Sequence, residues 1–200
     1  MFESRSALAG YGAERVAGAN GDFGALRLGE APGTPLVHVG IYPGARERVA
    51  AQAATVLGGA IPDSPVQAVT AGVHLMMRIA PDQYWILGGA PELDGVLRAA
   101  ISPENASITS LDGARTRLII EGPRARALLA GLVAIDLQPA AFPVHGFAQT
   151  GIHHVGGLLL RVSEDRYDFF ALRTFAASTW EVLLDAARPF GYEIVHERMK

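Results

Sequence analysis

The sequence predicts an α+β fold built of two duplicated halves, with antiparallel sheets and a pseudo-two-fold axis between the halves. Half of the 200 residues are apolar and only 18% are charged, so the chain can bury a sizeable core. Helical and strand patterns alternate, but most strands come in hairpins, which favours antiparallel sheets with helices on one face. Two ten-residue stretches also share one pattern, RIAPDQYWIL at 78–87 and RVSEDRYDFF at 161–170.

Residues 1–33 are rich in glycine and alanine and weakly periodic, which predicts an extended N-terminal arm. One short strand is expected in the arm, at GALRLGE (24–30). An arm of this kind usually needs another surface to lie on. The remaining residues, 34–200, are expected to form one domain of two similar halves.

The first half reads as a strand, a helix, a hairpin and a helix. PLVHVGIY (35–42) alternates and is rich in β-branched residues, as strands are, and a helix over 43–59 follows. After a proline-rich connection come a hairpin over 72–88 and a helix over 90–101 with Pro91 in its first turn. The apolar face of the first helix carries Val49, Ala53, Val56 and Leu57.

The second half reads as a hairpin, a short helix, a strand followed by a further hairpin, and a long helix before a last strand. SITSLDGARTRLIIEGP (107–123) reads as a hairpin around an Asp112–Gly113 turn, and a short helix over 123–132 follows. Residues 147–172 read as one strand and a further hairpin. The longest helix is expected over 173–191, before a last strand. Its apolar face carries Ala176, Trp180, Leu183, Leu184 and Ala187.

The repeated stretch pairs residue by residue when Arg78 is aligned with Arg161, an offset of 83 residues. Two copies of this length do not make a solenoid, and they indicate two similar halves. The aspartates, Asp82 and Asp165, suit tight turns. The arginines are expected to be exposed strand charges paired with the acidic turn, and an anion site in a groove is the alternative.

The two copies differ at one informative position, where Trp85 aligns with Asp168. In two halves of the same topology these side chains face similar directions in different surroundings. We therefore expect Trp85 to be covered by protein or a partner, and Asp168 to face water or a cation.

Composition excludes several classes of protein. The chain has no cysteine, which removes disulfides, thiolate nucleophiles, iron–sulfur ligation and most structural zinc sites. The net charge is −3 without a basic stripe, so no nucleic-acid partner is expected. No apolar run approaches membrane-spanning length and no secretory signal is recognisable, so no membrane partner and a cytoplasmic location are expected.

Catalytic and metal-binding patterns are absent from the sequence. It contains no GxSxG elbow, no HExxH pair and no phosphate-binding Walker loop, so no catalytic residue is predicted. His153 and His154 are neighbours on an expected strand, where they would point to opposite faces and not chelate one ion. No metal is therefore expected.

The stretch DLQPAAFPVHGFAQTGI, residues 136–152, is different in character. It has two prolines, two phenylalanines and few charges, outside any periodic element. Irregular buried backbone needs hydrogen-bond partners, so such a segment packs against a partner or acts as a clamp within the fold. Both roles remain open. The residues expected at a partner interface are Asp136, Pro139, Phe142, Pro143, Gln149 and Thr150.

Several of these motifs together resemble the gamma subunits of heterotetrameric sarcosine oxidases. They are SLDGARTRLIIEGPRARALLA, AIDLQPAAFPVHGFAQT and YDFFALRTFAASTWEVLLDAA, with RIAPDQYWILGG and LVHVGIYPG before them. The resemblance covers residues 24–192. Its most specific part is Asp136-Leu137-x-Pro139, then Phe142-Pro143 and Ala148-Gln149-Thr150. Val144-His145 departs from the family, which has a second proline or glycine there.

The resemblance implies a fold similar to the folate-binding domain of glycine-cleavage T-proteins, the aminomethyltransferases. It also implies alpha, beta and delta subunits as partners in a complex that oxidatively demethylates sarcosine to glycine. FAD, FMN, NAD and tetrahydrofolate are then expected on other subunits and none on this chain alone, whose role would be non-catalytic assembly. N-methylglutamate dehydrogenase complexes use a similar subunit, and the sequence does not separate the two.

A stand-alone tetrahydrofolate-binding, aminomethyltransferase-like protein is the alternative. Asp112 would pair with the aminopyrimidine ring of the pterin, and Phe142 or Phe147 would stack on it. The cysteine-bearing KGCYxGQE-type motif of tRNA-modifying relatives is absent, and no C-terminal barrel of the aminomethyltransferase kind is recognisable. A third possibility is an orphan that keeps the fold without the complex.

Overall fold

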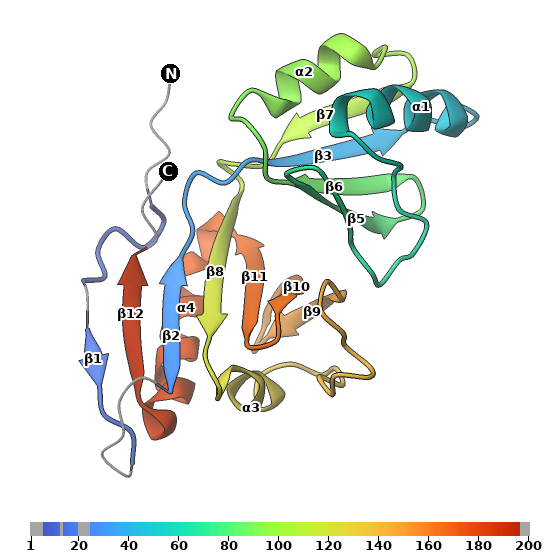
Figure 1. Cartoon of the computed structure of the whole chain (residues 1–200). Helices are drawn as coiled ribbons and strands as arrows, with labels where there is room; N and C mark the ends of the chain where they lie inside the picture. The colour runs from blue at the N-terminus through green and yellow to red at the C-terminus, as the bar shows by residue number, and fades with distance from the viewer. Residues whose placement is uncertain (1–5, 13, 20–24, 197–200) are drawn as a thin grey trace. The chain divides into compact units, whose positions relative to one another are not determined.

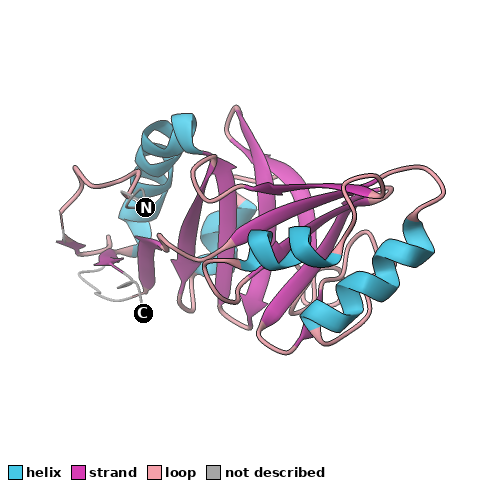
Figure 2. Ribbon diagram, turned by 90° about the horizontal axis from the view of Figure 1, so that it is seen from above, coloured by secondary structure: helices cyan, strands magenta, loops and turns pink. Residues whose placement is uncertain are grey.

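The computed structural model describes residues 6–12, 14–19 and 25–196. The chain divides into two compact units, one of residues 33–113 and one of residues 1–32 with 114–200. Both are mixed helix and sheet with mainly antiparallel strands, which confirms the predicted class (Figures 1 and 2). No helix in these described parts is long and apolar enough to cross a bilayer.

The 33–113 unit is a five-stranded antiparallel sheet with two helices. The strand order is β4-β5-β6-β3-β7, and a single core joins the sheet to both helices, which lie on the same side of it (Figure 1). Its elements are β3 (Leu36–Ile41), α1 (Arg46–Leu57), β4 (Val69–Ala71), β5 (His74–Ala80), β6 (Gln83–Leu87), α2 (Leu93–Ala100) and β7 (Ala106–Ser110).

Helix α1 shows why the sequence pattern works. Val49, Ala53 and Leu57 recur at a spacing of four and are buried, as predicted for a helix that packs one stripe on a sheet. Gly58 ends the helix with φ +77°, a left-handed conformation that favours glycine. Its amide donates to the carbonyl of Ala54 at 2.9 Å.

The second unit, of residues 1–32 and 114–200, is a seven-stranded sheet in the order β1-β12-β2-β8-β11-β10-β9. Short 3-10 turns, Arg173–Phe175 and Arg188–Phe190, flank its long helix. Its elements are β1 (Arg15–Val16), β2 (Leu26–Glu30), β8 (Arg115–Glu121), α3 (Ala125–Ala130), β9 (Phe147–Ile152), β10 (Val155–Ser163), β11 (Arg166–Leu172), α4 (Ala176–Ala187) and β12 (Tyr192–His196).

The two units share one chain topology, strand-helix-strand-hairpin-helix-strand. The order β4-β5-β6-β3-β7 in one unit corresponds to β9-β10-β11-β8 and then β12 in the other. The second unit differs because β2 lies between β8 and β12, antiparallel to the first and parallel to the second. The strand expected in the N-terminal arm is therefore confirmed, and it completes the sheet. Gly24, expected to begin it, lies outside the described residues. Separation of an arm, 1–33, from a domain, 34–200, stays a prediction.

The repeated stretches form matching hairpins, as predicted. Arg78 pairs with Tyr84 in one unit and Arg161 with Tyr167 in the other. In both hairpins the strand register shifts directly after the arginine, between Arg78 and Ala80 in one and between Arg161 and Ser163 in the other. The offset of 83 residues thus holds for backbone pairing and irregularity as well as for residue type.

The hairpin predicted over 107–123 is wrong. Both strands exist, but β7 pairs with β3 in the five-stranded sheet, whereas β8 pairs with β2 and β11 in the seven-stranded sheet. Alternation and a turn between two strands predict strands without saying which neighbours they bond to. Here the Asp112–Gly113 turn is the passage from one compact unit to the other.

Candidate partner-contact site

The predicted irregular segment lies in the second unit, between α3 and β10. We call residues 136–152 the contact segment; its last six residues are strand β9 at one edge of the sheet. Apolar anchors alternate with exposed residues along it. The anchors, each at most 6% exposed, are Leu137, Phe142, Phe147 and Ile152. The exposed residues include Asp136, Pro139, Pro143, Val144 and Gln149, and Thr150 is half-buried.

The irregular part of the contact segment satisfies much of its own backbone. The Asp136 carboxylate accepts from the amide of Gln138 at 2.9 Å, an Asx turn. The Gln138 carbonyl then accepts from the amide of Phe142 at 2.8 Å, and the Pro143 carbonyl from that of Gly146 at 2.8 Å. The segment is thus a built loop that presents two prolines and a valine to its surroundings. These hydrogen bonds support a role as a clamp within the fold. The exposed residues are also compatible with a surface that a partner binds.

The buried side chain of Arg161 is hydrogen-bonded to this loop. Its side chain is 5% exposed, and its guanidinium donates to the carbonyl oxygens of Phe142 and Glu164, each at 2.8 Å, and of Ser163 at 3.3 Å. The expectation of an exposed strand charge is therefore wrong for Arg161. The reason is that backbone carbonyls of an irregular loop offer the buried cation as many acceptors as an acidic turn would.

Aromatic rings complete this support. The guanidinium carbon of Arg161 lies 5.8 Å from the ring centre of Tyr167, within the range of cation–π attraction. The ring of Phe142 in turn lies nearly parallel to that of Tyr167, with centroids 6.5 Å apart and an interplanar angle of 9°. Phe142 is therefore joined to the hairpin both through its carbonyl and through its ring.

In each unit the buried tyrosine of the repeat interacts with two arginines and an aspartate. Burial raises the pKa of Tyr167, opposed by Arg161 and Arg126, while Asp165 raises it further. Burial likewise raises the pKa of Tyr84, opposed by Arg46 and Arg78, while Asp82 raises it. The alignment of the repeats predicted that the two tyrosines, the two aspartates and Arg78 with Arg161 correspond between the units. It missed the correspondence of Arg46 with Arg126. An offset of 80 residues, close to that of the repeat, was the signal for it.

The residues of the folate alternative fall in both units. The Asp112 carboxylate accepts from the amide of Leu36 at 2.7 Å within the 33–113 unit, where it ties the end of β7 to β3. Phe142 and Phe147 belong to the other unit and are 6% and 2% exposed, packed within it. Their pairing around a pterin stays a prediction.

The position where the repeats differ behaves as expected. Trp85 is 6% exposed, so protein covers it. Asp168 is fully buried, and its carboxylate accepts from Arg117 Nε at 2.7 Å and Arg166 Nε at 3.2 Å. Asp168 therefore faces cations, as one of the two predicted surroundings required.

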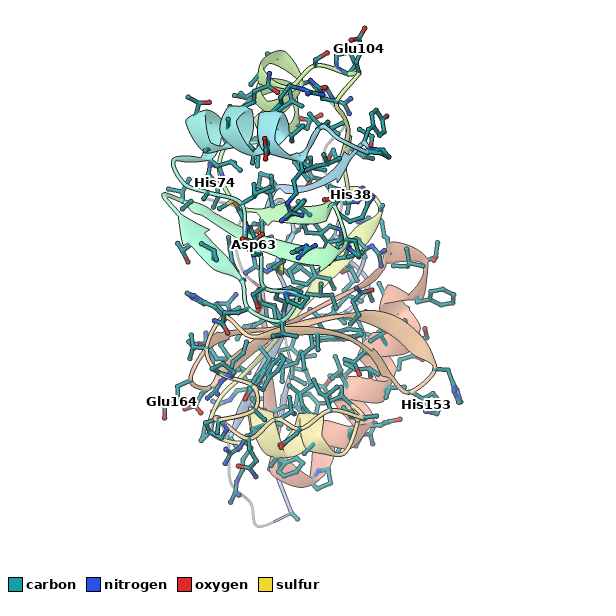
Figure 3. All side chains as sticks on the ribbon, turned by 90° about the vertical axis from the view of Figure 1, so that its right-hand side faces the viewer. His38, Asp63, His74, Glu104, His153 and Glu164 are labelled. Carbon is teal, nitrogen blue, oxygen red and sulfur yellow. The ribbon has the colours of Figure 1, made fainter. Side chains whose placement is uncertain are left out.

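The histidine pair is placed differently from the prediction. His153 and His154 form the turn between β9 and β10, with His153 at φ +55° and the ring centroids 3.9 Å apart. They do not point to opposite faces, because they lie on a turn and not within a strand. Figure 3 shows His153 at this tip. Among the described residues, no group of three or more histidine or acidic side chains is arranged to hold a metal ion.

A buried carboxylate that the sequence reasoning missed anchors the N-terminal residues. Glu30, 7% exposed, accepts from the Ser6 hydroxyl, the amides of Ala7 and Leu8 at 3.0 and 3.2 Å, and Thr116 Oγ1 at 2.7 Å. Four donors saturate the carboxylate, which pins the chain beside β2. A cavity of about 200 Å³ adjoins it, lined also by Tyr11 and Trp180.

Comparison with known proteins agrees with this architecture. The GCVT N-terminal domain family model matches residues 70–196. A sarcosine oxidase gamma subunit from Arthrobacter sp is 30% identical over 172 residues, which are 84% of this chain and 82% of that protein.

Two solved structures extend the comparison. The heterotetrameric sarcosine oxidase from Corynebacterium sp. U-96, in complex with pyrrole 2-carboxylate, contains a chain that matches with a TM-score of 0.75 and 25% identity, over 86% of both chains. The glycine cleavage system aminomethyltransferase T from Bartonella henselae matches with a TM-score of 0.61 and 16% identity, over 86% of this chain and 48% of that chain, and shows the fold. The chain belongs to the GCVT N-terminal domain family and to the family of sarcosine oxidase gamma subunits.

Proposed function

We propose that this chain is the gamma subunit of a flavin-dependent heterotetrameric sarcosine oxidase, and that it contributes assembly rather than catalysis. The observation that carries the proposal is the family membership over most of the chain together with the contact segment. That segment exposes Pro139, Pro143 and Val144 on a loop much of whose backbone is already hydrogen-bonded. Because such a loop is already ordered, it loses little conformational entropy when a partner binds to it.

The partners in this proposal are the alpha, beta and delta subunits, and the compartment is the cytoplasm. FAD, FMN, NAD and tetrahydrofolate would lie on those subunits, where sarcosine is demethylated to glycine. The interface residues on this chain are those of the contact segment, with Phe142 acting as the internal anchor and the exposed Asp136, Pro139, Pro143 and Gln149, with Thr150, facing the partner.

Co-expression tests the proposal directly. An affinity-tagged chain is produced together with the genes that flank its own, and the purified material is analysed for bound flavin and for oxidation of sarcosine and of N-methylglutamate. Co-purification of a flavoprotein that oxidises sarcosine supports the proposal. A tagged monomer without any flavoprotein overturns it, and a complex that oxidises only N-methylglutamate replaces the substrate.

A matched pair of surface variants tests the contact segment. Val144 is 40% exposed, and Val144→Asp places a charge where the partner must remove water, so binding to the flavoprotein is expected to weaken at least about tenfold. Val96 is 50% exposed on α2 of the other unit, and Val96→Asp is the control. Equal binding by both variants would remove Val144 from the interface.

The tetrahydrofolate-binding alternative is favoured by one finding, the match to the GCVT N-terminal domain. Calorimetric titration of the isolated chain with tetrahydrofolate separates the two functions. Saturable heat that Asp112→Asn removes supports the alternative. No heat at millimolar ligand ends it.

A further inference from the structure

The contact segment is braced by a residue that the repeat supplies. Arg161 is one of the two aligned arginines, and its guanidinium reaches three carbonyl oxygens, those of Phe142, Ser163 and Glu164. A planar guanidinium carries five donors in a rigid fork spread over three nitrogens, so it spans several carbonyls in one fixed geometry. A lysine ammonium has three donors on a single nitrogen and does not span the same positions. The side chain therefore ties the loop to the β10–β11 turn.

The backbone of Arg161 is also hydrogen-bonded to the same loop. Its carbonyl accepts from the amide of His145 at 2.7 Å, and its amide donates to the carbonyl of Gly146 at 2.9 Å. His145 has φ +65°, and a Cβ on Gly146 would lie 2.8 Å from the carbonyl oxygen of Pro143. The loop base is thus held in a backbone conformation with little room to relax.

The other copy of the repeat shows what is particular to this brace. Arg78 donates to the carbonyl of Asp63 at 2.9 Å, in the loop that precedes β4, so it makes the same kind of contact at the equivalent place. That side chain is half-buried and donates to the carbonyl of one residue, whereas the buried Arg161 donates to the carbonyls of three. Both units therefore use the arginine of the repeat to hydrogen-bond a loop carbonyl, and the unit whose loop exposes the prolines has more of these bonds.

We infer that Arg161 is a positioning residue for partner binding, holding Pro139, Pro143 and Val144 in the conformation that the other subunits bind. This inference rests on the proposed function. Arg161 is 5% exposed, so it acts through the loop and not as a large part of the interface. When only a fraction of the molecules holds the binding conformation, the apparent dissociation constant rises by the inverse of that fraction.

The test uses the full chain with Arg161→Lys and, independently, Gly146→Ala, which crowds the loop base against the Pro143 carbonyl and leaves the arginine side chain in place. Binding is measured against the co-purified flavoprotein subunits. Both variants are expected to bind at least about tenfold more weakly. Both are also expected to lower the melting temperature of the isolated chain, so binding is measured at a temperature at which each variant is fully folded. Hydrogen exchange at residues 142–146 of the isolated variants is expected to accelerate, a readout that general destabilisation would spread over the whole unit.

Two matched controls accompany these variants. Arg78→Lys makes the same change in the other repeat copy. Gly156→Ala adds a methyl group within 4 Å of which the described part of the chain places no atom beyond the adjoining residues. Both are expected to bind the flavoprotein as the wild type does.

Each outcome has one reading. Wild-type affinity in Arg161→Lys and Gly146→Ala, with accelerated exchange at 142–146, overturns the inference and leaves the proposed function standing. Equal weakening by Arg78→Lys and Arg161→Lys also overturns it. If the wild-type chain binds no flavoprotein, the proposed function itself fails, and the inference fails with it. Should Arg161→Lys not fold, Gly146→Ala alone decides between weakened and unchanged binding.

Discussion

At the scale of single residues, the most informative position is the one where the two repeats disagree. Asp168 replaces a tryptophan, is fully buried, and lies between Arg117 and Arg166. A buried carboxylate persists where cations and hydrogen bonds replace the water that it has lost. The alignment of the repeats predicted a change of surroundings here, but which residues would supply the cations depended on strand pairing.

Asp168→Asn removes that charge with little change in size. It leaves Arg117 and Arg166 without their carboxylate, so the free energy of unfolding is expected to fall by about 3–5 kcal/mol. Urea denaturation of the isolated chain measures it. Asp185→Asn is the control, because its pair with Arg188 is exposed and a change of at most about 0.5 kcal/mol is expected. Equal stability of the two variants would show that the buried pairs contribute nothing net.

At the scale of elements, the insertion of β2 distinguishes the two units. Leu26 and Leu28 of this strand are fully buried, which accounts for its place inside the sheet. Gly29 accounts for the approach of β12, because a Cβ there would lie 2.4 Å from the carbonyl oxygen of Val195. The pattern of GALRLGE indicated a strand, but its neighbours come from residues more than 80 positions further along the chain.

Gly29→Ala is expected to push β2 and β12 apart. Forcing a methyl group into this contact should lower the free energy of unfolding by about 1–3 kcal/mol, measured by thermal and urea denaturation. Gly113→Ala should change the free energy of unfolding little, because no atom of the described residues other than its chain neighbours lies within 4 Å of the added methyl. A Gly29→Ala protein as stable as the wild type would mean that the two strands separate at no cost.

The helices and the two repeated hairpins were the most predictable elements. The stripe on α1 was read from its spacing, and on α4 Ala176, Trp180, Leu183 and Ala187 are buried as expected, with Leu184 half-buried. Thr179 is also buried but was not predicted to be, because it is a polar residue. Its hydroxyl donates to the carbonyl of Phe175 at 2.8 Å. Periodicity reports which face is apolar and is blind to polar residues that find a partner within the helix.

At the scale of the whole molecule, tyrosine burial predicts how stability depends on pH. Burial raises the pKa of Tyr84 and Tyr167 above the ordinary value of 10.0, and also that of Tyr11 and Tyr192. The unfolded chain then ionises before the folded one. Stability is therefore fully present below about pH 10 and is lost as the pH rises through and above that value.

Tyr167→Phe tests this dependence. The hydroxyl of Tyr167 is buried and has no hydrogen-bond partner among the described residues, so the variant should be about as stable as the wild type at pH 7. Above about pH 10 its free energy of unfolding should fall less steeply with pH than that of the wild type. Urea denaturation at a series of pH values measures both slopes. Identical slopes would show that Tyr167 is not among the groups that unfold the protein in alkali.

The sequence by itself determined the class of the fold, the duplication and the irregular character of the contact segment, because these depend on local periodicity, turn chemistry and residue type. Only the tertiary structure decided that β7 and β8 part into different sheets and that β2 enters between β8 and β12. It also decided that Arg161 is buried beneath the loop. Each of these depends on pairing between residues distant in sequence, where backbone hydrogen bonds and packing choose the partner and no local pattern records the choice.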